Sequence, residues 1–222
     1  MAFTLPASGS LELFIEFCIN AAAALNARAE TRHLAPFWRQ LLAALKQARD
    51  ARDLAREGWV EAIAIYNVVR LEWNEALTKL SGVAFLEAGK KASAEPYHGS
   101  FGSTTAAKAR GLGAARAVQA GSLLLTRLAA INHPALAEAT AAFQVAQGAL
   151  AQAAAGRRQA FEAFLAHSNH RTRHLGEAQT AIHNTEADLL KLFPGNRARV
   201  RVVLSPPGAN ERKEAREAEA PA

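Results

Sequence analysis

The chain has 222 residues, of which 50% are hydrophobic and 21% are charged, and its formal net charge is +6. This composition is typical of a globular protein and excludes a disordered or fibrous chain. The single cysteine, Cys18, excludes an intramolecular disulfide. Alanine is the most abundant residue, and because it is the best helix former the composition predicts an all-α fold.

A proline separates the first two predicted helices. The first begins after Ser10, a residue type that caps helices, and extends to about Leu34. Pro36 stands in the first turn of a second helix, where a missing backbone N–H costs little, and helical sequence continues to about Gly89. Gly58 is a weak point where this long helix could break.

The amino-acid composition changes after the second helix. Residues 90–105 are rich in glycine, proline and hydroxyl side chains, so they predict a loop. Helical sequence resumes near Thr105 and runs to Ile131. A further helix begins at Pro134 and continues to about Phe193.

Large apolar residues of the second helix recur at alternating three- and four-residue spacing, which places them on one face. Arg70 interrupts this apolar stripe. A stripe of this kind predicts the core of a helical bundle rather than a cofactor site. Its members are Trp59, Ile63, Tyr66, Trp73, Leu77 and Leu80.

An internal repeat relates the two halves of the chain. Pro134 lies 98 residues after Pro36, and Gly156 lies 98 residues after Gly58. The sequence therefore predicts an elongated antiparallel helical bundle built from two similar helical hairpins, with coincidence as the alternative. The predicted parts are helical unit one (1–89), a loop (90–105), helical unit two (106–193), and a basic extended segment with a flexible tail (194–222).

Positive charge gathers in two segments that contain no acidic residue, 99–133 and 194–204. In the second segment Arg alternates with apolar residues, and this period predicts extended backbone. Such segments favour an anionic partner: nucleic acid, or an anionic membrane or granule surface. The candidate residues are Lys108, Arg110, Arg116, Arg197, Arg199 and Arg201.

Histidine is concentrated in "HSNHRTRH", residues 167–174. His170 and His174 are one helical turn apart, which would let both bind one metal ion, but the neighbouring arginines oppose a cation. The alternatives are a histidine flank on the surface, exposed or in contact with a partner, and a pH-sensitive contact.

The sequence contains no nucleotide-binding loop and no recognisable catalytic nucleophile, so we expect neither an enzyme nor a cofactor. No apolar run is suited to cross a membrane, and the first residues lack the basic part of a secretion signal, which indicates a cytoplasmic protein. We expect a helical scaffold or protein-interaction module that binds a protein or a second copy of itself. The alternative is the binding protein for anionic surfaces described above.

Overall fold

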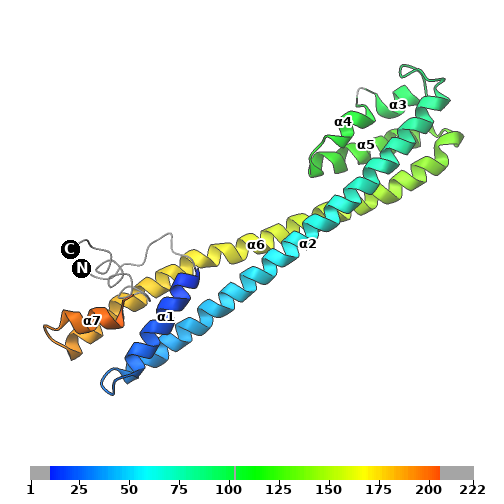
Figure 1. The fold of residues 1–222 in the computed structure, drawn as a ribbon. Helices are drawn as coiled ribbons and strands as arrows, with labels where there is room; N and C mark the ends of the chain where they lie inside the picture. Colours follow the sequence, from blue (N-terminus) through cyan, green and yellow to red (C-terminus); the bar gives the residue numbers. More distant parts are fainter. Residues whose placement is uncertain (1–10, 103, 206–222) are drawn as a thin grey trace, which may run out of the picture. The chain divides into compact units, whose positions relative to one another are not determined.

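In the computed structural model, residues 11–102 and 104–205 are described, except for the side chains of residues 169–172 and 175. The described residues form helices and turns without a strand, so the predicted all-α class is confirmed (Figure 1). The helices are α1 (Leu11–Asn26), the 3-10 helix η1 (Arg32–Leu34), α2 (Ala35–Glu87), α3 (Tyr97–Phe101), α4 (Ala106–Arg110), α5 (Ala114–Ile131), the 3-10 helix η2 (Pro134–Leu136), α6 (Ala137–Leu192) and α7 (Arg197–Val203).

The two long helices α2 and α6 each contribute to two compact units. Unit 1 consists of Met1–Ala55 together with Phe164–Ala222, and unit 2 consists of Arg56–Ala163. This division differs from the sequence-based one at residues 89 and 106. It arises because α2 packs against α6, so residues far apart in the sequence share one core.

Helix boundaries follow the prolines more closely than the glycines. Pro36 lies in the first turn of α2, and Pro134 opens η2 just before α6. Gly58 and Gly156 lie inside α2 and α6, and a Cβ at either position would meet nothing within 4 Å. Neither glycine ends its helix, since α2 continues to Glu87 and α6 continues to Leu192.

Three sequence-based assignments need correction. The loop predicted at residues 90–105 contains the short helix α3 at residues 97–101. The helix predicted to reach Leu34 ends at Asn26, and turns connect it to η1. The helix predicted from Thr105 to Ile131 is interrupted at residues 111–113, between α4 and α5. Glycine at two of these three positions explains the interruption, since glycine is a poor helix former.

Residues 194–204 also differ from the extended backbone predicted for them. Residues 197–203 form α7, and the Asn196 side chain caps this helix by accepting a hydrogen bond from the Arg199 N–H at 3.1 Å. Val200, Val203 and Leu204 are buried in the core of unit 1. Burial of one helical face therefore outweighs the alternating pattern of the sequence.

The core of unit 1 is built around Trp38 of α2, which is fully buried. Its indole N–H donates to the Thr185 hydroxyl of α6 at 3.0 Å, and its ring lies 5.6 Å from that of Phe17 in α1. Cys18 of α1 is fully buried in the same core, as expected for a small core residue.

The core of unit 2 repeats this kind of contact with other residues. The indole N–H of Trp73 in α2 donates to the Gln147 side-chain oxygen of α6 at 2.7 Å. The Gln147 amide then donates to the Val118 carbonyl oxygen of α5 at 2.7 Å. Gln147 thus connects α2, α5 and α6. Its side chain has room because Gly121 of α5 carries no side chain.

None of the helices within residues 11–102 and 104–205 combines the length and the apolar character needed to cross a bilayer.

Substitution of Gly121 by Ala is expected to destabilise unit 2, because the new Cβ would collide with the Gln147 amide. We expect a loss of about 1–2 kcal/mol in the free energy of unfolding, measured with urea. The matched control is Gly148→Ala in α6, where a Cβ meets nothing within 4 Å and helix propensity should stabilise the protein by up to about 1 kcal/mol. Equal stabilisation by both substitutions would contradict the assigned packing.

Cys18 is expected to be unreactive in the folded protein. Burial raises the pKa of its thiol to about 12, so almost no thiolate is present at neutral pH. A chromogenic disulfide reagent should label the thiol only when urea unfolds the chain. Labelling at the rate of a free thiol in native buffer would contradict the burial of Cys18.

Candidate functional site

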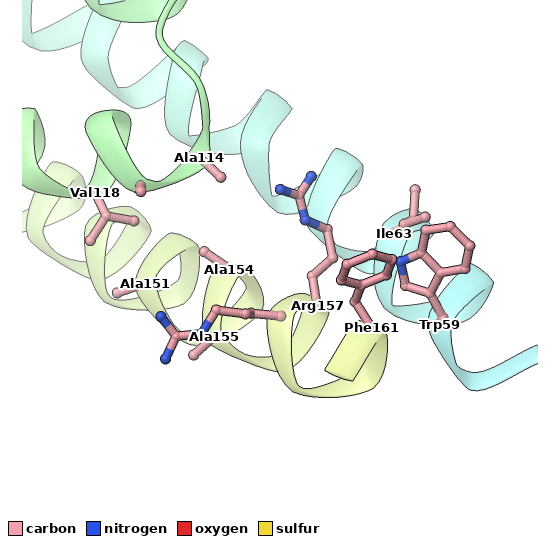
Figure 2. A pocket seen from close by; sticks show the side chains of 11 residues that line it. Trp59, Ile63, Ala114, Val118, Ala151, Ala154, Ala155, Arg157 and Phe161 are labelled. Atoms are coloured by element: carbon pink, nitrogen blue, oxygen red, sulfur yellow. The ribbon is translucent and has the colours of Figure 1, made fainter. Parts of the chain in front are cut away.

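A hollow in unit 2 forms an apolar trough between α2, α5 and α6, with a volume of about 630 Å³ (Figure 2). Its size falls within the usual range for ligand and docking pockets. Figure 2 shows Trp59 of α2 next to Phe161 of α6. The alanines of α6 lie further along the helix that carries Phe161. The lining residues are Trp59, Ile63, Ala114, Ala115, Val118, Ala151, Ala154, Ala155, Arg157, Arg158 and Phe161.

The trough exists because small residues line it where α5 begins. Gly113 caps α5 without a side-chain hydrogen bond, and Ala114 and Ala115 form the first turn of the helix. On the facing side α6 presents Ala151, Ala154 and Ala155. Methyl side chains on both walls leave the space between the helices unfilled.

Two aromatic side chains remain partly exposed in the trough. The rings of Trp59 in α2 and Phe161 in α6 lie 5.2 Å apart, tilted by 45°. Phe161 keeps 39% of its surface exposed. Since Trp59 faces Phe161 while Trp73 faces Gln147, α2 and α6 run antiparallel in this unit. Partly exposed aromatic rings in a hollow are typical of protein-binding sites.

Two arginines give the trough a positive edge. The guanidinium carbon of Arg157 lies 4.4 Å from the centre of the Tyr66 ring, a cation–π contact that holds the charge beside the apolar wall. Arg158 lies 3.6 Å from the Glu162 carboxylate, and both side chains are largely exposed, so this pair is weak. The trough therefore combines an apolar floor with cations.

The basic residues predicted from the sequence lie in different units. Lys108 and Arg110 of α4 and Arg116 of α5 are exposed in unit 2. Arg116 directly follows the alanines that line the trough. The other three, Arg197, Arg199 and Arg201, are exposed on α7 in unit 1, where Arg199 lies 4.9 Å from the centre of the Phe193 ring.

Arg70, which interrupts the apolar stripe of the sequence, has a structural role. Its guanidinium donates hydrogen bonds to the backbone oxygens of Ala109, Arg110 and Leu112, at 3.0–3.3 Å. It also lies 4.5 Å from the centre of the Trp73 ring. Arg70 thus caps the carboxyl end of α4 and fixes the connection into α5, which forms one wall of the trough.

Sequence reasoning did not find the trough. Trp59 and Ile63 were assigned to the core stripe, and the alanines of α6 carry no signal by themselves. The arginine pair at 157–158, beside alanines and one helical turn from Phe161, was the available sign of a partly apolar, basic surface.

The histidine segment shows a local ion-pair network. The Glu177 carboxylate accepts hydrogen bonds from Arg173 at 3.0 Å and from the His174 ring at 3.1 Å. The side chain of His170, the other predicted metal ligand, lies outside the described residues. Among the described residues no cluster of three or more potential metal ligands is found. The metal site at His170 and His174 stays a prediction.

No protein-family model, no curated protein and no solved structure matches the chain.

The hydrogen bonds from Arg173, and then from His174, hold the pKa of Glu177 below its ordinary value. Because the pKa of Glu177 is lower in the folded state, its ionised carboxylate stabilises the fold at pH values above the usual pKa of glutamate. This stabilisation is lost as the pH falls through the folded-state pKa. We expect NMR titration to show Arg173→Ala raising the pKa of Glu177. An unchanged titration in the variant would contradict this network.

Proposed function

We propose that this chain is a non-enzymatic helical scaffold that binds a protein partner, and that a helix of the partner docks in the trough. The observation that carries the proposal is the open trough at the amino-terminal end of α5. From Ala114 onward α5 covers the α2–α6 pair, whereas Trp59 and Phe161 are only partly covered. A further helix would continue the packing that α5 begins.

The chemistry of the walls favours a helix over a small ligand. The alanines of α6 would let another backbone approach closely, while the two aromatic rings offer the anchoring contacts that dominate protein interfaces. The arginines at the edge would select a partner with acidic groups beside its apolar face.

Site-specific cross-linking in cells tests this proposal. A photoreactive amino acid replaces Ala155, an exposed residue of the trough, and the adduct is identified by mass spectrometry. We expect a defined protein adduct at Ala155 that is lost when Ala151→Arg fills the trough. The matched control places the same photoreactive group at Gln152, an exposed α6 residue that does not line the trough. Equal adducts at both positions, or none at Ala155, would overturn the proposal.

The second candidate function is binding to nucleic acid or to an anionic membrane or granule surface. It is favoured by the exposure of Lys108, Arg110 and Arg116 on α4 and α5. With so few cations in each unit, such binding would be weak at physiological salt. Salt-resistant retention on DNA or heparin, lost when these three residues are replaced by Glu, would favour this function over the scaffold.

Two further sequence-based predictions remain proposals. The first is the internal duplication, which is supported by the recurrence of a helix, a 3-10 helix and a long helix in α1–η1–α2 and in α5–η2–α6. The second is the cytoplasmic location.

A further inference from the structure

We propose that the helix bound in the trough is α2 of a second copy of this chain, which docks through its outer face. This inference depends on the proposed function, because it names the partner of the same trough. It starts from an exposed apolar row on α2, formed by Val60, Ala64, Val68 and Leu71. Spacings of four, four and three residues place them on one helical face. Val60, Val68 and Leu71 are 55%, 58% and 59% exposed. An apolar row of this kind is typical of an interaction surface.

Acidic side chains flank this row. Glu57, Glu61, Glu72 and Glu75 are all exposed. From residue 57 to residue 78 the only basic residue of α2 is Arg70, whose guanidinium is bound to the backbone oxygens at the end of α4. We call the four apolar and four acidic residues the acidic stripe.

The acidic stripe and the trough are complementary in charge and in length. The trough carries Arg157 and Arg158, and the amino-terminal end of α5 in its wall adds partial positive charge. Along α6 the trough extends from Ala151 to Phe161, about 15 Å at the helical rise. The apolar row from Val60 to Leu71 is about 16 Å long.

Charge also determines how two copies would pair. Contact between two acidic stripes would bring glutamates against glutamates, which opposes a symmetric dimer through this face. At 100° per residue, the apolar row lies roughly opposite Tyr66 and Trp73, which α2 buries in unit 2. One copy can therefore use its stripe and its trough at the same time, so the contact is head-to-tail and leads to rings or open assemblies.

The test uses the full-length protein and two charge-reversal variants. The stripe variant is Glu61→Lys/Glu72→Lys, and the trough variant is Ala155→Glu/Arg158→Glu; all four residues are exposed. The control is Glu87→Lys/Glu138→Lys, two exposed residues of unit 2 outside both surfaces. Sedimentation velocity measures assembly, and circular dichroism checks that each variant is folded.

We expect the wild-type chain and the control to form species larger than a dimer as concentration rises. Each reversal should weaken assembly by about tenfold or more. An equimolar mixture of the stripe and trough variants should assemble again, because the intact trough of one variant meets the intact stripe of the other. The lysines of the reversed stripe are also complementary in charge to the glutamates of the reversed trough.

Three results would overturn this inference: a wild-type chain that stays monomeric, reversals without effect, or a mixture that does not associate. If the cross-link at Ala155 then captures a different protein, the trough is a docking site for that protein and the scaffold proposal stands. If Ala155 yields no specific adduct either, both proposals fail.

Discussion

Each unit depends on a buried indole N–H that needs a partner. Trp38 and Trp73 lie on α2, and each donates to a polar side chain of α6, Thr185 in unit 1 and Gln147 in unit 2. A buried donor without an acceptor costs more than a hydrogen bond contributes, so these contacts favour one register of α2 against α6. Once this register is set, α1 and α7 complete one core and α5 completes the other.

The sequence predicts the helices well because their determinants are local. Alanine content, Pro36 and Pro134 act within a few residues, and they place the starts of α2 and α6 to within a few positions. The same local rules fail at α7, where strand-like alternation is outweighed by burial of Val200 and Val203 against distant residues. The grouping of α1, α7 and the end of α6 in one core depends on contacts between distant segments, such as that of Trp38 with Thr185, which local rules do not address.

The candidate site was harder to predict because it is a hollow that small side chains leave between helices. In the sequence, an alanine predicts only that a residue is helical. The trough forms because alanines of α5 and α6 face each other and do not fill the space between the two helices. Arg70 is a second case in which the role of a residue cannot be read from the sequence. In the sequence it interrupts an apolar stripe, whereas in the fold its charge is matched by the backbone oxygens at the end of α4. The basic residues of α4 and α5 were predicted, but the apolar trough whose lining residues directly precede Arg116 depends on the fold.

The fit of Gln147 against Gly121 has a consequence for how related chains would diverge. The two positions and Trp73 form one set, because the amide that satisfies the indole occupies the space that glycine leaves. A larger residue at 121 destabilises the core unless 147 also changes, and a chain with a changed 147 must supply the indole with another acceptor. These three positions should therefore be inherited together, and a chain that differs at only one of them would have compensated elsewhere in the core of unit 2.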